Sequence, residues 1–396
     1  MAKSNPPFSN LTERLSGPRS RAWDVTDRAT RMETEGREII HLGVGDPDFD
    51  TPQPIIDAAI RSMSSGRTHY SAIPGEPGLR SAIADDFAER NGTTITAEQI
   101  NVFPGAQCAL FATLLCLAGP GDEVILLEPF YATYEGVARA GGADVVTVPL
   151  PAQSHFGLDT GAISNAITSR TRVILVNSPG NPTGAVFSKS SWHALLTLCV
   201  EKDIWLVSDE VYANLAFDGE HISPLSLAGA EDNVVVVSSI SKSHAMTGWR
   251  LGWTISPAAL SAHLDNLAQC LLFGVSQFTQ DAAAYALRNG QPDVAAMKKT
   301  MCERRDALCD ALESIDGLVV HRPAGGMFAM VDVAALRCDG ESFANGLLDH
   351  GGVAVVPGFA FGDSASNYVR IGYLSDVAVI KKAADKIRDF VSSLSV

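Results

Sequence analysis

Short apolar runs alternate with longer amphipathic stretches through most of the 396-residue chain. Such runs indicate buried strands, and the stretches between them repeat apolar residues at helical spacing. A first strand is predicted at 38–42, ahead of the alternation, which begins near residue 52 and includes strands at 124–127, 144–148, 173–176, 204–208, 234–237 and 251–255. The main helices predicted around them cover 54–64, 77–91, 106–117 and 189–201. The pattern therefore predicts an α/β fold in which helices cover both faces of a mostly parallel sheet.

The pattern changes in the last third of the chain. Three helical stretches follow Pro257 and end near residue 314. Beyond them, short strands at 318–321, 327–331, 353–356 and 368–371 alternate with helices at 341–350 and 377–393. This arrangement indicates a smaller α+β domain, whereas residues 1 to about 35 suggest an irregular arm with a short helix. We expect an N-terminal arm with part of the small domain at 1–51, a large domain at 52–290 and a small C-terminal domain at 291–396.

Composition and charge narrow the class of protein. The chain carries 30 basic and 45 acidic residues, a formal net charge of −15, which argues against a nucleic-acid-binding surface. No apolar run reaches the roughly 18 residues of a membrane span, and the N-terminus lacks the apolar core of a signal peptide. The seven cysteines include no CxxC pair, which favours a reducing compartment and core packing over a metal site. We therefore expect a cytoplasmic protein.

The polar loop after the predicted strand 234–237 carries the first candidate chemistry. It contains Lys242, and a lysine that is desolvated or lies near another cation becomes neutral and nucleophilic. A neutral amine condenses with an aldehyde to a Schiff base. Ser239 and Arg250 suit a phosphate group, and pyridoxal 5'-phosphate is the cofactor that combines an aldehyde with a phosphate. A solvated lysine on a polar loop is the alternative interpretation.

Other candidate residues follow other predicted strands. Asp209 comes directly after strand 204–208, and a buried carboxylate there would keep a pyridine nitrogen protonated. Tyr212 could donate a hydrogen bond to the oxygen on the same ring, and so could the amide of Asn181 after strand 173–176. Each residue also has a simpler interpretation, since aspartate often caps turns and Asn-Pro often forms one.

A helix N-terminus and an aromatic residue add to this set. Gly105, Ala106 and Gln107 open a predicted helix, whose first backbone N–H groups could bind a phosphate. Tyr131 follows strand 124–127 and could stack on a planar ring, although an isolated aromatic is as often part of the core.

Four motifs stand in an order and at spacings that resemble the class I/II aminotransferases, fold type I of the pyridoxal-phosphate enzymes. The motifs are Asn181-Pro182-Thr183-Gly184, Asp209-Glu210-Val211-Tyr212, Ser239-Ile240-Ser241-Lys242 and Gly248-Trp249-Arg250. The resemblance extends from about residue 38 to the C-terminus and includes the segments 43–52, 68–80 and 368–373. It is closest in character to aspartate aminotransferases and to arginine:pyruvate and aspartate:2-oxo acid transaminases.

The resemblance implies roles for individual residues. Lys242 would carry the Schiff base and move the proton at the substrate α-carbon, and Asp209 and Tyr212 would complete the catalytic set. Arg370 would bind the substrate α-carboxylate with the help of Asn181 and the backbone of Gly45. The residues implied to contact pyridoxal phosphate are Gly105, Ala106, Gln107, Tyr131, Asn181, Asp209, Tyr212, Ser239, Lys242 and Arg250, with Tyr70 reaching across from a second subunit of a homodimer with shared active sites.

The substrate pair is the least determined property. The implied reaction is a two-step transfer of the α-amino group from an L-amino acid to a 2-oxo acid. An aspartate-like donor with glyoxylate, pyruvate or oxaloacetate as acceptor is our expectation from the resemblance. Gln107 stands where many aspartate-specific relatives have a lysine, so recognition of a second carboxylate is unexplained. An arginine:pyruvate transaminase and a pyridoxal-phosphate-dependent β-lyase are the alternatives.

Overall fold

The computed structural model describes residues 8–15 and 21–394, and part of the predicted N-terminal arm, 1–7 and 16–20, lies outside the described residues. The described part of this arm holds two helices, α1 (Asn10–Leu15) and α2 (Asp24–Thr34), so it is more helical than the irregular arm with one short helix that the sequence predicts. None of the helices in the described ranges is long and apolar enough to cross a membrane.

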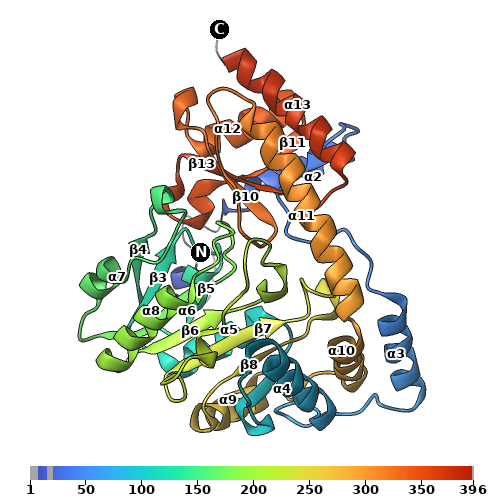
Figure 1. Cartoon of the computed structure of the whole chain (residues 1–396), viewed down its shortest axis with the longest axis vertical. Helices are drawn as coiled ribbons and strands as arrows, with labels where there is room; N and C mark the ends of the chain where they lie inside the picture. Colours follow the sequence, from blue (N-terminus) through green and yellow to red (C-terminus); the bar gives the residue numbers. More distant parts are fainter. Residues whose placement is uncertain (1–7, 16–20, 395–396) are drawn as a thin grey trace, which may run out of the picture.

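A seven-stranded sheet forms the large part of the molecule (Figure 1). In spatial order its strands are β2 (Ile100–Phe103), β8 (Gly252–Ile255), β7 (Val234–Ser239), β6 (Trp205–Asp209), β5 (Thr171–Asn177), β3 (Glu123–Glu128) and β4 (Asp144–Pro149). β8 runs opposite to the other six strands of this sheet, which share one direction, and this confirms the prediction of a mostly parallel sheet.

Strand β2 was not predicted because Asn101 interrupts its short apolar run. The structure explains how this polar residue is tolerated in a buried strand. The Asn101 amide donates to the carbonyl oxygen of Ser261 at 3.2 Å and accepts from the Ser261 hydroxyl at 2.8 Å. A partner 160 residues away in the sequence therefore satisfies the buried amide, and no local pattern indicates it.

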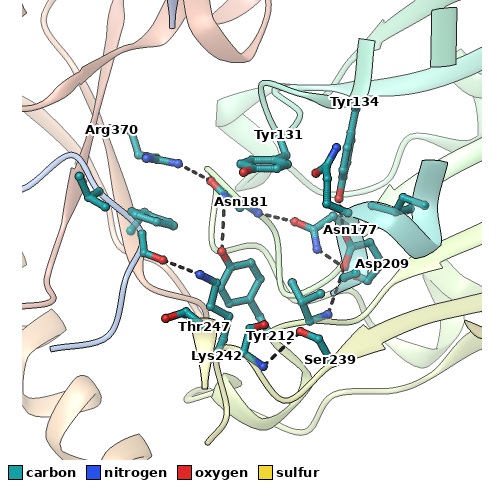
Figure 2. Close-up of a pocket in the computed structure, with 18 of the residues that line it drawn as sticks. Tyr131, Tyr134, Asn177, Asn181, Asp209, Tyr212, Ser239, Lys242, Thr247 and Arg370 are labelled. Carbon is teal, nitrogen blue, oxygen red and sulfur yellow. Dashed lines mark hydrogen bonds between the residues drawn. The ribbon is translucent and has the colours of Figure 1, made fainter. Parts of the chain in front are cut away.

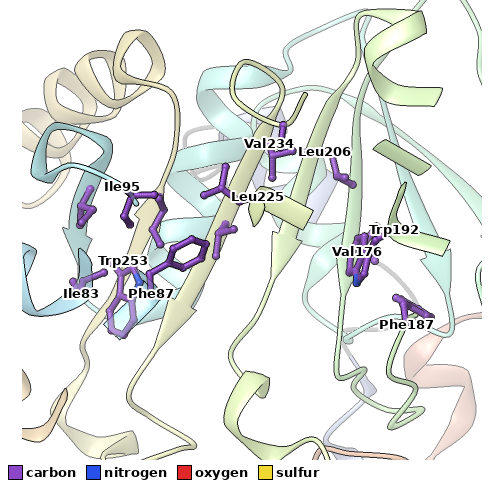
Figure 3. Close-up of a cluster of buried hydrophobic side chains, with 14 of the residues drawn as sticks. Ile83, Phe87, Ile95, Val176, Phe187, Trp192, Leu206, Leu225, Val234 and Trp253 are labelled. Atoms are coloured by element: carbon purple, nitrogen blue, oxygen red, sulfur yellow. The ribbon is translucent and has the colours of Figure 1, made fainter. Parts of the chain in front are cut away.

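Both faces of the sheet are buried, as the continuous apolar strands predict. Along β3, Val124 and Leu126 belong to one hydrophobic cluster, whereas Ile125 and Leu127 belong to another, because successive side chains of a strand point to opposite faces. The helices of the first cluster are α5 (Ala106–Leu117), α6 (Tyr134–Ala140) and α9 (Ala258–Leu271). The second cluster, drawn in Figure 3, includes residues of α3 (Gln53–Ser64), α4 (Pro77–Asn91), α7 (Thr160–Ala166), α8 (Lys189–Lys202) and α10 (Gln277–Asn289).

A smaller part is built on a four-stranded antiparallel sheet and a two-stranded parallel one. Their strands, in spatial order, are β12 (Val356–Pro357), β13 (Tyr368–Gly372), β10 (Phe328–Asp332) and β9 (Val319–His321), and then β1 (Ile40–His41) and β11 (Val353–Ala354). The long helix α11 (Gln291–Glu313) runs between the two parts of the molecule, and α12 (Gly340–Gly346) and α13 (Val377–Leu394) pack with it around the small sheets (Figure 1). The domain boundaries expected from the sequence stay a prediction.

Two elements of this smaller part differ from the sequence-based expectation. The single strand predicted at 353–356 is divided, because β11 pairs with β1 whereas β12 pairs with β13 in the other sheet. The helix predicted at 341–350 is α12 followed by one π-helical segment, Leu347–Gly351. Both differences arise from pairing and packing at a distance, which the local hydrophobic pattern does not contain.

Candidate active site

The carboxyl ends of β5, β6 and β7 meet the N-terminus of α5 beside a cavity of about 340 Å³ (Figure 2). Residues from β13 and from the segment after β1 close this cavity from the side of the smaller sheets. Eleven of the thirteen residues singled out from the sequence line it: Gly45, Ala106, Gln107, Tyr131, Asn181, Asp209, Tyr212, Ser239, Lys242, Arg250 and Arg370. Gly105 and Tyr70 are the two that do not line it.

Lys242 lies in the loop after β7, with its amine inside the cavity. Its Nζ donates a hydrogen bond to the carbonyl oxygen of Gly45 at 2.5 Å. Burial lowers the pKa of the Lys242 amine to about 8. The negative charge of Asp46 opposes this shift, whereas the guanidinium groups of Arg250 and Arg370 add to it. A useful fraction of the amine is therefore neutral near physiological pH, as a nucleophile requires.

Asp209 ends β6 at the bottom of the cavity and is buried. The Tyr134 hydroxyl donates to Asp209 Oδ2 at 2.5 Å, and the Val211 N–H donates to Oδ1 at 3.2 Å. Burial nevertheless dominates and raises the pKa of Asp209 to about 6, with Glu210 adding to the shift. A carboxylate of this kind gains most from a ligand that offers a positively charged N–H group.

Two asparagines connect the loop after β5 to its neighbours. The Asn177 amide donates to the carbonyl oxygen of Asp209 at 2.9 Å, and its Oδ1 accepts from the N–H of Asn181 at 2.6 Å. Asn181 Nδ2 in turn lies 3.3 Å from the hydroxyl oxygen of Tyr212, to which it donates. These contacts fix the Asn181 amide and the Tyr212 phenol side by side in the cavity wall.

Arg370, on β13, is a buried cation without a carboxylate partner among the described residues. It donates to Asn181 Oδ1 at 2.8 Å and to the carbonyl oxygen of Gly43 at 2.6 Å. Its guanidinium lies over the rings of Phe328 and Phe361, 3.8 and 4.8 Å from their centroids, and its Nε has no hydrogen-bond partner there. Burial lowers its pKa to about 10, so it stays charged at neutral pH. A buried, unpaired cation is costly, which indicates that an anionic ligand completes it.

The N-terminus of α5 and Arg250 form a cradle at the other end of the cavity. Gly105 precedes the helix with φ of 85°, and a Cβ built on it would lie 2.2 Å from Arg250 Nη2. A Cβ on Gly252 would lie 2.5 Å from the backbone nitrogen of Ala106. Arg250 donates to the carbonyl oxygen of Thr247 at 2.7 Å and forms no ion pair with a described carboxylate. The first N–H groups of α5, the guanidinium and the nearby Ser239 hydroxyl together suit a phosphate.

Two predicted aromatic residues have different surroundings. Tyr131 lines the cavity and contacts Tyr134 edge to face, with ring centroids 5.7 Å apart. Tyr70 is 81% exposed and touches the ring of Phe273, also exposed, at a centroid distance of 5.1 Å. Tyr70 is therefore outside the cavity of its own chain.

Several residues of the site were not identified from the sequence. Tyr134 holds Asp209, Asn177 holds Asn181, and the Phe328 and Phe361 rings enclose Arg370. Asn177 begins the NSPGNPTG segment and could have been included on that signal. The two phenylalanines had no signal of their own, because single apolar residues of a small domain are ordinarily core.

The donor set fits pyridoxal phosphate group by group. The cradle offers a phosphate site, Asp209 offers a carboxylate for a protonated ring nitrogen, and Lys242 offers an amine for an aldehyde. Tyr131 supplies an aromatic face for a planar ring. The Arg370 guanidinium lines the same cavity without a carboxylate partner among the described residues, which leaves a separate place for the carboxylate of a substrate.

Comparisons with known proteins agree with this assignment. Residues 37–387 match the family "Aminotransferase class I and II". The chain is 47% identical over 380 residues to an arginine–pyruvate transaminase from Pseudomonas aeruginosa, covering 96% of this chain and 97% of that one. It is 35% identical over 365 residues to an aspartate/prephenate aminotransferase from Thermus thermophilus, covering 91% and 93%. The solved structure of Thermus thermophilus aspartate aminotransferase with maleate superposes with a TM-score of 0.93 at 34% identity, covering 97% of this chain and 100% of that one.

The fold and the site thus define a pyridoxal-phosphate enzyme of fold type I. The chain belongs to the class I and II aminotransferases, and it is a pyridoxal-phosphate-dependent transaminase. The family resemblance seen in the sequence motifs is confirmed.

Proposed function

We propose that this transaminase transfers the α-amino group of arginine, or of another amino acid with a basic side chain, to pyruvate. The observation that carries the proposal is the charge of the cavity: its cationic lining, among the described residues, consists of Lys242, Arg250 and Arg370. Each has its own task in the mechanism below, so none is left to pair with a carboxylate on the donor side chain. The 47% identity to an arginine–pyruvate transaminase supports the same donor and acceptor.

The proposed cofactor contacts follow the donor set of the cavity. Asp209 would bind the ring nitrogen and Tyr131 the ring face, while Tyr212 and Asn181 would bind the ring oxygen. The phosphate would be held by the backbone N–H groups of Ala106 and Gln107, by Ser239 and by Arg250, with Gly105 leaving room for the guanidinium. Bound pyridoxal phosphate supplies a carrier for the amino group and a ring that withdraws electrons from the substrate Cα.

Lys242 moves the proton at the substrate Cα in this mechanism. Its amine lies in the cavity, and its pKa of about 8 lets it accept and release a proton near neutral pH. Lys242 takes the proton from the donor Cα in the first half-reaction. It returns a proton to the former keto carbon of the acceptor in the second.

Arg370 orients both substrates, because the donor and the acceptor share the α-carboxylate. The Phe328 and Phe361 rings fix its guanidinium plane, and the contacts to Asn181 and to the Gly43 carbonyl fix its rotation. A fixed planar fork binds a carboxylate through two parallel hydrogen bonds. The backbone of Gly45, which also lines the cavity, would complete the carboxylate site.

A homodimer with shared active sites is part of the proposal. Tyr70 and Phe273 form an exposed aromatic pair, which a second copy of the chain would cover. Tyr70 would then reach the cofactor phosphate of the other subunit. Dilution below the dimer dissociation constant should abolish activity.

The aspartate-like donor expected from the sequence is a second candidate, with glyoxylate, pyruvate or oxaloacetate as acceptor. It is supported by the relatives named as aspartate aminotransferases, at 33–35% identity over more than 90% of the chain. This donor needs a cation for its second carboxylate. Gln107 supplies none, and its side-chain oxygen already accepts from the Thr133 hydroxyl at 3.0 Å.

A donor and acceptor screen of the purified holoenzyme tests the proposal. Arginine and lysine with pyruvate should give kcat/KM values at least tenfold above aspartate with any of the three acceptors. If kcat/KM is higher with aspartate than with arginine and lysine, the proposed basic donor is wrong and the aspartate-like donor takes its place. Borohydride reduction should fix the cofactor on the peptide that contains Lys242, and a label on another lysine would refute the assigned site.

A further inference from the structure

A second, acidic groove adjoins the cationic cavity. It has a volume of about 590 Å³, and no lysine, arginine or histidine lines it among the described residues. Thr247 lines both spaces, so they meet at this side chain. The groove residues that matter here are Asp46, Asp48, Asp50, Trp249 and Phe278.

Asp46 is the acidic residue of this groove that lies nearest to the chemistry. It directly follows Gly45, whose carbonyl oxygen accepts from the Lys242 amine at 2.5 Å. The Thr247 hydroxyl donates to Asp46 Oδ1 at 2.7 Å and so fixes the carboxylate beside the boundary of the two spaces. No cation of the described chain forms an ion pair with Asp46. Its remaining acceptor positions are therefore available to a ligand.

The other two aspartates of the groove are less suited to contact a substrate. Asp48 is already paired, because Arg304 donates to its two oxygens at 2.6 and 3.0 Å. Asp50 is exposed, as Asp46 is, but no hydrogen bond from a described residue orients its carboxylate. Asp46 is thus the one acidic side chain, among the described residues of the groove, that combines a fixed orientation with a free face next to Thr247.

The cavity and the groove, which adjoin at Thr247, carry charges of opposite sign. In the cavity, Arg370 is buried and has no carboxylate partner among the described residues, which points to a bound carboxylate. In the groove, Asp46 offers a carboxylate to a cation. An amino acid with a long basic side chain has this arrangement of charges, with its α-carboxylate at one end and its cation at the other.

We infer that Asp46, positioned by Thr247, selects donors by pairing with the cationic end of their side chain. The inference rests on the proposed function, since it names the residue that reads the basic donor in the same site. A charge-assisted hydrogen bond between a carboxylate and a guanidinium is stronger than a neutral one, and it distinguishes arginine from an uncharged molecule of the same shape. Trp249 and Phe278 add apolar walls along which a methylene chain could lie.

The test compares arginine with citrulline, its uncharged isostere, as donors to saturating pyruvate. The quantity measured is the ratio of the two kcat/KM values in the holoenzyme. Asp46→Asn should reduce this ratio at least tenfold, because only arginine loses an ion pair. Asp50→Asn removes the same charge from the same groove and should leave the ratio unchanged.

The ratio separates selection from an effect on the catalytic amine. Asp46 also faces Lys242, and a change in that amine would alter the rate with both donors by the same factor and leave the ratio intact. If Asp46→Asn lowers kcat/KM for arginine and for citrulline by the same factor, the inference is wrong. The proposed function would still stand in that case, provided that the unmodified enzyme uses arginine as a donor. An unmodified enzyme that uses neither arginine nor lysine would reject the proposed donor and the inference together.

Thr247 provides the control for positioning. Thr247→Val removes the hydroxyl that holds Asp46 and should lower the arginine-to-citrulline ratio, whereas Thr247→Ser keeps a hydroxyl and should restore most of it. A ratio that is the same in the valine and serine variants would show that Thr247 does not position Asp46.

Discussion

Asp209→Asn should stabilise the cofactor-free enzyme at neutral pH while weakening its hold on the cofactor. In the cofactor-free chain the Asp209 carboxylate is buried with hydrogen bonds from Tyr134 and Val211, and none of the described residues pairs a cation with it. Burial raises its pKa from the ordinary value of 3.8 to about 6, which corresponds to a penalty of about 3 kcal/mol once both the folded and the unfolded chains are ionised.

The sign of the pH dependence follows from this raised pKa. Between about pH 4 and pH 6 the folded state holds a proton on Asp209 that the unfolded state has released, so stability falls as the pH rises through this window. Above pH 6 the full penalty applies. Asparagine carries no charge and so has no such penalty. Its amide has one oxygen in place of two, so one of the two hydrogen bonds that Asp209 accepts is lost, which offsets about 1 kcal/mol of the stability gained. From pH 5 to pH 8, the stability of the variant relative to the unmodified enzyme should increase by about 1.4 kcal/mol.

Urea denaturation of the two cofactor-free proteins at pH 5 and pH 8 measures this difference. Asp50→Asn, which removes an exposed carboxylate, controls for the change in net charge. Added pyridoxal phosphate should reverse the order, because only the carboxylate keeps the ring nitrogen protonated, and the variant should bind it at least tenfold more weakly. A variant that is less stable at both pH values, or whose advantage is the same at both, would refute the reasoning.

Three further predictions concern the other parts of the site. Lys242→Ala should still bind the cofactor through its phosphate and ring contacts but should lose at least 10³-fold in turnover, and near-normal turnover would contradict its role in proton transfer. Arg370→Lys should raise KM for every donor and acceptor about tenfold or more, because an ammonium cannot replace the planar fork, and a loss confined to one donor would make Arg370 a reader of the side chain instead. Gly105→Ala should weaken phosphate and cofactor binding at least tenfold, because the new Cβ would displace Arg250 and because alanine disfavours a backbone φ of 85°. Gly78→Ala is the control: a Cβ there has nothing within 4 Å, so this variant should bind phosphate and cofactor normally in the same titration.

The local pattern predicted most of the fold because the parallel strands are buried on both faces. Runs such as 234–237 are apolar throughout for this reason and are visible without any partner. Where an element depends on a partner that is distant in the sequence, the local pattern either did not predict it or predicted it with the wrong bounds. Strand β2 depends on Ser261 to satisfy Asn101, and the predicted strand 353–356 is divided between two sheets.

The candidate site shows the same division between sequence and structure. Parallel strands place their carboxyl ends at one edge, so residues such as Asp209 and Lys242, which follow strands, could be expected to meet. Their motifs alone sufficed to identify the family and its cofactor. The sequence by itself thus determined the type of fold and the class of reaction, whereas the roles of the individual residues stay predictions.

Only the tertiary structure decided the state of those residues. The Tyr134 hydroxyl on Asp209 and the Phe328 ring over Arg370 come from elements far from those residues in the chain. Burial together with such neighbours sets the pKa of Asp209 and of Arg370. The meeting of a cationic cavity with an acidic groove at Thr247 is likewise a property of the folded chain. The physical reason is that residue type can be read locally, whereas desolvation and charge pairing depend on which groups the fold brings within a few ångströms of one another.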